Sequence, residues 1–150
     1  MSLIDNKYFD MKKLAFLITS AFAITSCANN SSSQNDLVKS QEETMKIHDE
    51  IMPQVSVFDK SAVTIDSILT NLNAIKASKP TLDTALTRQE LTLLKKDLED
   101  ATDHMMDWMK EYSTDSTTVD YAHRELTRVK EMKAVFDRVS KEQQQILSKY

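Results

Sequence analysis

Four stretches of the chain place apolar residues three or four positions apart, the spacing that puts them on one face of an α-helix. The predicted helices span Asp36–Phe58, Ala62–Ala77, Arg88–Tyr112 and Thr118–Lys149. The connections between them are short, and no repeat with a period of 20–50 residues indicates a solenoid. Amphipathic helices joined in this way predict an all-α fold, an up-down-up-down antiparallel four-helix bundle.

Local signals predict where these helices bend, end and begin. Pro53 lies inside the first predicted helix, where it removes a backbone donor and clashes with the carbonyl of Asp49, so we expect a kink or a split there. Pro80 ends the second, because the residue before a proline avoids the α region. Thr87–Glu90 is a capping box for the third helix. That helix has the most regular apolar face: Leu91, Leu94, Leu98, Ala101, Met105, Trp108 and Tyr112.

Composition narrows the possible functions. The chain contains no glycine and two prolines, which excludes glycine-rich phosphate loops and dinucleotide-binding fingerprints. Its net charge is −4, and it becomes −5 without the three basic and two acidic residues of positions 1–26. A mildly acidic domain has no electrostatic attraction to nucleic acid, so we expect no nucleic-acid partner.

An export signal precedes the first predicted helix. Lys12 and Lys13 lead into an apolar run, Leu14–Ile24, which has the length of a signal peptide's apolar region and falls short of the roughly 20 residues of a membrane span. The acidic residues within Met1–Asp10 do not suit the region before such a run, so we expect translation to start at Met11. The predicted parts are a signal peptide at 1–26, a lipidated cysteine with a flexible polar tether at 27–35, and a helical bundle domain at 36–150.

The end of the apolar run, Ile24-Thr25-Ser26-Cys27, resembles the lipobox of bacterial lipoproteins. In that family the cysteine thiol is acylated with diacylglycerol, and a dedicated peptidase cuts just before the cysteine, which becomes the first residue of the mature protein. The resemblance implies that Cys27 is lipidated and that the membrane holds the chain through this anchor. Ala28 is not a retention signal of the Asp type, and the tether lacks an acidic cluster for surface display. We therefore expect an outer-membrane lipoprotein facing the periplasm.

Two motifs in the mature part extend this resemblance. Met-x-x-His-Asp-Glu-x-Met-Pro at 45–53 and Met-Met-x-Trp-Met at 105–109 resemble small helical lipoproteins of Bacteroidota. The resemblance covers most of the mature chain and implies location and fold. It implies no activity, and no catalytic or binding residue is carried over from it.

The sequence contains no recognisable catalytic set. Serine, histidine and aspartate are present, but no strained elbow or glycine-based oxyanion loop accompanies them. Asp120-x-x-His123 is the nearest approach to the two Glu-x-x-His pairs of a di-iron bundle. We therefore predict a non-enzymatic bundle that binds another envelope protein or has a structural role. Its exposed faces are well charged, so we expect a monomer.

A soft-metal site is the alternative. In the predicted topology Met52, Met105 and His123 lie in about the same layer, with His48 one turn deeper. Imidazole and thioether groups together suit Cu(I). Methionine is also a common filler of irregular cores, and a histidine on an apolar face is more often a hydrogen-bonded core residue than a ligand. Our main interpretation is therefore core packing without a cofactor, and the alternative is a copper site formed by His48, Met52, Met105 and His123.

Overall fold

The structure is a computed structural model, and it describes residues 26–150. These residues form four helices: α1 (Ser26–Thr70), α2 (Leu72–Ser78), α3 (Thr84–Glu111) and α4 (Val119–Leu147). No strand occurs among them, so the predicted all-α bundle is confirmed. The predicted start at Met11 and the signal peptide before Ser26 lie outside the described residues.

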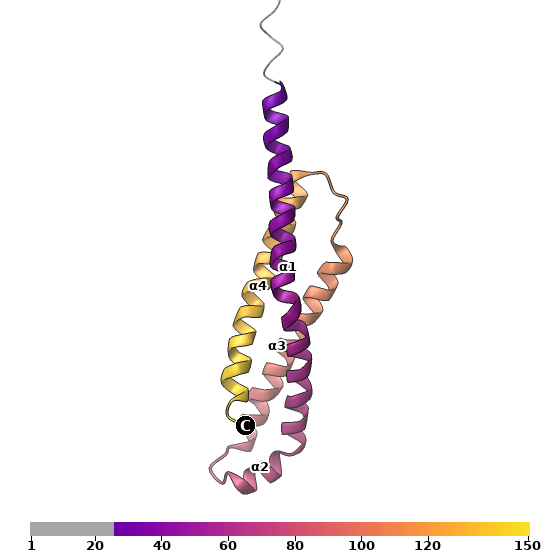
Figure 1. Cartoon of the computed structure of the whole chain (residues 1–150). Helices are drawn as coiled ribbons and strands as arrows, with labels where there is room; N and C mark the ends of the chain where they lie inside the picture. The colour runs from indigo at the N-terminus through magenta and orange to yellow at the C-terminus, as the bar shows by residue number, and fades with distance from the viewer. Residues whose placement is uncertain (1–25) are drawn as a thin grey trace, which may run out of the picture.

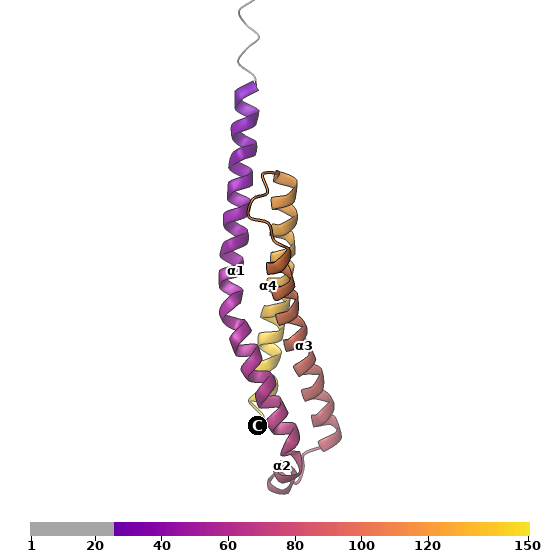
Figure 2. The same ribbon diagram turned by 90° about the vertical axis from the view of Figure 1, so that its right-hand side faces the viewer.

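The lengths of the helices differ from the prediction. The first predicted helix and the first part of the second form one continuous helix, α1, so the predicted boundary between Phe58 and Ala62 is wrong. The rest of the second predicted helix forms α2. Three long helices alternate in direction, and the short α2 forms the corner between α1 and α3 (Figure 1). Consequently the part of α1 up to Phe58 runs antiparallel to α3 and parallel to α4 (Figures 1 and 2), whereas we had expected it to run parallel to α3.

Packing explains why α1 does not stop near Asp59. Phe58 and Ile65 are 1% and 0% exposed, and their seven-residue separation places both on the buried face of one uninterrupted helix. Ser61, a possible capping residue, instead donates its hydroxyl hydrogen bond back to the Val57 carbonyl at 2.8 Å. Serine and aspartate near the middle of a helix can thus be accommodated inside it when both flanking segments bury apolar residues in the same core.

Pro53 kinks α1 without splitting it. The helix includes Pro53, and Figures 1 and 2 show α1 changing direction near its middle. Proline has no backbone N–H and its ring crowds the carbonyl one turn earlier, at Asp49, so the helix bends away from that contact. α1 contributes to the core on both sides of Pro53, through Ile51 before it and Phe58 after it.

We expect Pro53→Ala to raise the free energy of unfolding by about 1 kcal/mol. The substitution restores one helical hydrogen bond and removes a steric clash, together worth up to about 3 kcal/mol. It also raises the conformational entropy of the unfolded chain, which lowers the free energy of unfolding by about 0.4–1 kcal/mol. Urea denaturation followed by circular dichroism measures the change. Pro80→Ala is the control, because Pro80 lies between α2 and α3 and its replacement gains no helical hydrogen bond. A larger loss of stability in Pro53→Ala than in Pro80→Ala would show that packing requires the bend.

The segment that we predicted to be a flexible tether is helical. α1 is described from Ser26, and its first part projects past the ends of α3 and α4 (Figure 1). Within α1, residues 31–36 are exposed and Leu37 is buried, at 5% exposed. Residues 27–35 continue the helix that packs in the core, because extending an existing helix is far easier than nucleating one.

The third predicted helix begins earlier than expected. Asp83 is its N-cap, and the Asp83 carboxylate accepts hydrogen bonds from the backbone N–H groups of Ala85 and Leu86 at 2.9 and 3.0 Å. The predicted capping residue Thr87 lies inside α3 and is buried. Aspartate and threonine are both good capping residues, and the upstream one begins the helix. The fourth predicted helix agrees with α4 to within two residues at its C-terminal end.

The core lies between the three long helices. Two aromatic rings, Phe58 of α1 and Phe136 of α4, stack with their centroids 4.9 Å apart. The buried cluster consists of Ile47, Ile51, Phe58, Ile65, Leu91, Leu94, Leu98, Ala101, Met105, Trp108, Val129, Phe136 and Val139. Because all of these residues belong to α1, α3 and α4, the described part of the chain contains a complete core. Within that part, no helix combines the length and hydropathy needed to cross a membrane.

Candidate functional site

A buried acidic residue distinguishes the end of the bundle at which α3 stops and α4 begins. Glu125 of α4 is 2% exposed, and it shares the inward face of the helix with Ala122 and Val129. A carboxylate taken out of water costs several kcal/mol unless hydrogen bonds and opposite charges compensate. The groups around Glu125 therefore determine what this end of the bundle can do.

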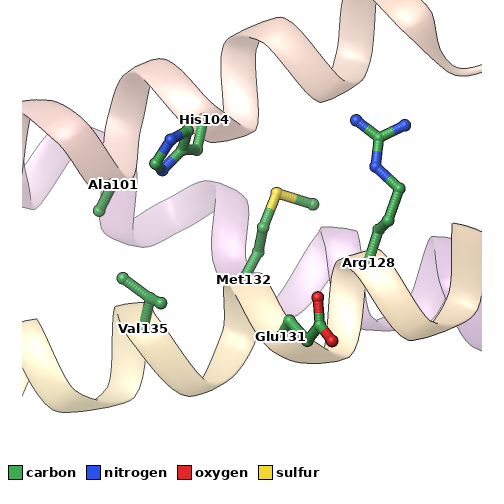
Figure 3. Close-up of a pocket in the computed structure, with 6 residues that line it drawn as sticks. All are labelled: Ala101, His104, Arg128, Glu131, Met132 and Val135. Atoms are coloured by element: carbon green, nitrogen blue, oxygen red, sulfur yellow. The ribbon is translucent and has the colours of Figure 1, made fainter.

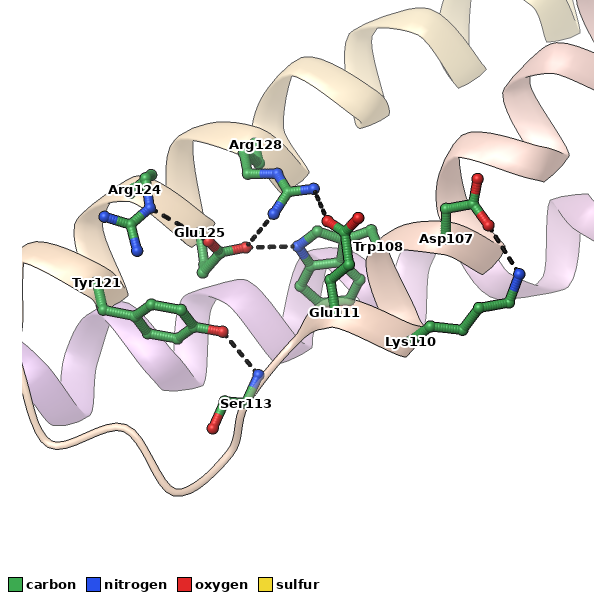
Figure 4. Close-up of polar contacts among 9 residues, drawn as sticks. All are labelled: Asp107, Trp108, Lys110, Glu111, Ser113, Tyr121, Arg124, Glu125 and Arg128. Carbon is green, nitrogen blue, oxygen red and sulfur yellow. Dashed lines mark hydrogen bonds and ion pairs between the residues drawn. The ribbon is translucent and has the colours of Figure 1, made fainter.

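Three side chains compensate for the burial of the Glu125 carboxylate (Figure 4). The indole Nε1–H of Trp108 donates to Glu125 Oε2 at 3.0 Å, and Arg128 Nη1 donates to the same oxygen at 3.2 Å. Arg124 Nε lies 3.5 Å from Glu125 Oε1. Arg128 also reaches across to α3, where its Nη2 donates to Glu111 Oε2 at 2.7 Å. We call these five residues the Trp108–Glu125 network.

The protonation of the surrounding groups follows from their contacts. The hydrogen bond to Glu111 raises the pKa of the Arg128 guanidinium above its ordinary value, and the charge of Glu125 adds to the rise. Burial raises the pKa of the Tyr112 phenol, and the nearby Tyr121 and Glu125 act in the same direction. Near neutral pH Arg128 is therefore charged and Tyr112 neutral, so neither provides a group that readily gives up a proton.

Aromatic contacts join the network to α1 and to the connection between α3 and α4. The His48 ring of α1 lies 5.8 Å from that of Trp108, centroid to centroid. Trp108 and Tyr112 are 4.7 Å apart, and Tyr112 and Tyr121 are 6.2 Å apart. The backbone N–H of Ser113 donates to the Tyr121 hydroxyl at 2.6 Å (Figure 4). All three long helices thus meet around Trp108.

A groove lies beside this network, between α3 and α4. Its volume is about 290 Å³, and we call it the α3–α4 groove. In Figure 3 the Met132 side chain extends into the space between the two helices, with Arg128 toward one end and Val135 toward the other. His104 of α3 and Glu131 of α4 are exposed, and neither has a hydrogen-bond or ion-pair partner among the described residues. The groove is lined by Ala101, His104, Arg128, Glu131, Met132 and Val135.

The structure does not bring the four candidate copper ligands together on one inward face. Met105 is fully buried in the core cluster, and Met52 packs against that cluster. His48 contacts Trp108, and its Nδ1 is 3.0 Å from Asp49 Oδ1. His123, however, is exposed. The His123 side chain therefore does not join the buried Met105 on the inward side of the bundle.

The position of His123 on α4 explains why its side chain is exposed. The inward face passes through Ala122 and Glu125, and consecutive residues of a helix are rotated by about 100° from one another. His123 consequently faces solvent one position after a buried alanine. Among the described residues, no group of three or more His, Cys, Asp and Glu could hold a metal ion. Methionine thioethers are not among these groups, so a Cu(I) site using methionine stays a prediction.

The methionines are also less buried than we expected. Met45, Met106 and Met109 are 38%, 40% and 41% exposed. Of the six methionines that the structure describes, only Met105 is fully buried, while Met52 and Met132 pack against the edge of the core. The gathering of methionines in the sequence is therefore largely a feature of the surface at this end of the bundle.

Sequence reasoning missed Glu125. Leu126 lies between Ala122 and Val129 at helical spacing and packs against the core, so the apolar pattern of the predicted fourth helix left no gap at Glu125. The single tryptophan of the chain was the available signal, because a buried indole N–H needs an acceptor. That signal calls for an acceptor near Trp108 and does not single out Glu125.

No family model matches the chain, and no curated protein or solved structure is significantly similar to it.

Proposed function

We propose that this chain is a monomeric lipoprotein of a bacterial cell envelope, anchored through Cys27 in the outer membrane and facing the periplasm. Its helical bundle binds another envelope component or serves structurally, without catalysing a reaction. The observation that carries this proposal is the sequence Lys12–Cys27, a cationic and apolar export signal that ends in a lipobox-like tetrapeptide.

The path of α1 supports an anchoring role for Cys27. Cys27 is the second residue of α1, and the buried Leu37 lies about ten residues further along the same helix. At a rise of 1.5 Å per residue, this segment makes a helical spacer of about 15 Å. Because the same helix continues through the bundle, the anchor and the core belong to one structural element, and force on the anchor passes directly to the core.

The contacts of the Trp108–Glu125 network support a non-enzymatic role. Both carboxylate oxygens of Glu125 are engaged by Trp108, Arg128 or Arg124. A general base needs an acceptor within reach of a substrate proton, whereas Glu125 is 2% exposed. The network instead fixes the register of α3 against α4, which is the best-attested use of buried polar groups in helical assemblies.

Metabolic labelling tests the proposed anchor. The full precursor is produced in a Gram-negative host that is fed an alkyne-tagged fatty acid, and incorporated label is detected on the purified protein. We expect label on the native sequence and none on Cys27→Ala. Ser26→Ala is the matched control, because it changes the neighbouring position yet keeps a small residue there, and it should retain the label. Equal labelling of Cys27→Ala and the native sequence contradicts the assignment of Cys27.

A density gradient of the host membranes tests the proposed location. We expect the labelled protein to sediment with outer-membrane β-barrel proteins and to be protected from protease added to intact cells. Sedimentation with the inner membrane, or cleavage by protease in intact cells, contradicts the outer-membrane, periplasm-facing placement.

A further inference from the structure

The charges around the α3–α4 groove leave one carboxylate without a counter-ion. Arg128 lines the groove, but its two terminal nitrogens donate to Glu111 and Glu125 at 2.7 and 3.2 Å. Arg124 lies against the other oxygen of Glu125. The two guanidinium groups are therefore matched by two carboxylates, and Glu131 remains as an excess negative charge on the wall of the groove.

The rest of the lining is apolar or can accept a hydrogen bond. Ala101 is 1% exposed, and Met132 packs against the core beside it. Val135 is 36% exposed, which leaves a sizeable apolar surface open at the far end of the groove from Arg128 (Figure 3). His104 stands on the opposite helix from Glu131 and, when neutral, its imidazole has one nitrogen that accepts a hydrogen bond.

We propose that the α3–α4 groove binds a small amphipathic cation, a protonated primary amine carrying a short apolar chain. The ammonium group is held by the Glu131 carboxylate, and the apolar chain covers Met132 and Val135. This site is independent of the lipid anchor, since it lies entirely within the bundle.

Charge and size both favour this ligand class. A carboxylate ligand would have to compete with Glu111 and Glu125 for the terminal nitrogens of Arg128 and would approach the unpaired charge of Glu131. An ammonium ion meets a free counter-ion instead. The groove volume of about 290 Å³ lies at the lower limit of sites for drug-sized ligands, roughly 300–1,000 Å³, so a ligand with only a few carbon atoms is appropriate.

Methionine-methyl NMR tests the proposal on residues 26–150 carrying Cys27→Ser, a stretch that contains the complete core. The six methionines of this stretch give separate methyl signals, and Met132→Leu identifies the signal of Met132. We expect n-hexylammonium to shift the Met132 methyl signal saturably, with a dissociation constant on the order of 1 mM. n-Hexanol and hexanoate have the same chain without the positive charge, and they should bind at least about five times more weakly.

Two isosteric variants separate a specific site from general adhesion. Glu131→Gln should weaken the binding of n-hexylammonium about five-fold or more, whereas Glu42→Gln should leave it unchanged. Glu42 is the matched control because it is exposed on α1 and also has no hydrogen-bond or ion-pair partner among the described residues. Equal binding of hexylammonium and hexanol, tighter binding of hexanoate, or unaltered affinity in Glu131→Gln overturns the proposal.

Discussion

Phe136→Ala is expected to lower the free energy of unfolding by about 3–5 kcal/mol. The Phe136 ring is 1% exposed and stacks on Phe58 at 4.9 Å between centroids. Its removal leaves a cavity between α1 and α4, and the loss of the ring pair adds to the loss of buried apolar area. Since a domain of this size has a total stability of about 5–15 kcal/mol, the variant should be close to unfolded at elevated temperature.

Urea denaturation followed by circular dichroism measures this effect, with Val135→Ala as the control. Val135 is the adjacent residue on α4, but it is 36% exposed, so its truncation should change the stability by no more than about 0.5 kcal/mol. A loss below about 1.5 kcal/mol for Phe136→Ala would mean that α1 and α4 do not pack through these rings, and the continuous α1 would lose its main physical support.

Glu125→Ala should lower the free energy of unfolding by about 2–3 kcal/mol. The substitution leaves the buried indole N–H of Trp108 without its acceptor, which costs about 1–3 kcal/mol, and it opens a cavity at a fully packed position. Arg124 and Arg128 are largely exposed, so water can solvate their released charges at little cost. Glu125→Gln keeps an acceptor of similar shape for Trp108, and its expected loss is smaller, about 1 kcal/mol.

Glu131→Ala is the matched control for this prediction. It removes the same side chain from the same helix, but Glu131 is exposed and has no ion-pair or hydrogen-bond partner in the described part of the chain. Its effect should stay within about 0.5 kcal/mol. A double-mutant cycle with Trp108→Phe should give a coupling energy of about 1 kcal/mol or more. A coupling near zero would show that the Trp108–Glu125 hydrogen bond adds nothing to stability.

The helical core could be predicted closely from the sequence where the apolar pattern was regular. The seven apolar residues expected on the inward face of the third helix, from Leu91 to Tyr112, are all buried in the core or packed against it. A seven-residue repeat of large side chains defines a helix face without knowledge of its neighbours. Val129, Phe136 and Val139 of α4 have the same helical spacing and are likewise buried.

The continuity of α1 could not be predicted in this way. Asp59 and Ser61 are residues that favour helix starts, and Pro53 is one that disrupts helices, so the local signals all favoured an interruption. Tertiary packing decided otherwise, because Phe58 and Ile65 reach the same core only if the helix continues between them. A single sequence does not show when tertiary packing overrides local helix-breaking and capping signals.

The exposure of His123 and the burial of Glu125 escaped the sequence analysis for related reasons. A shift of one residue on α4 separates the buried Ala122 from the exposed His123, and the apolar pattern does not fix a helix face to within one position. Glu125 was missed because a pattern of apolar residues excludes charged ones by construction. Its burial depends on Trp108 and Arg128, whose positions relative to Glu125 follow only from the packing of α3 against α4.

The proposed lipid on Cys27 is tested most directly by intact mass spectrometry of the protein extracted from host membranes. The account predicts one product that begins at Cys27, lacks the preceding 26 residues and carries the added mass of a diacylglyceryl group on the cysteine sulfur. A membrane-extracted chain that retains residues before Cys27, or that begins at Cys27 with a free thiol, would contradict it.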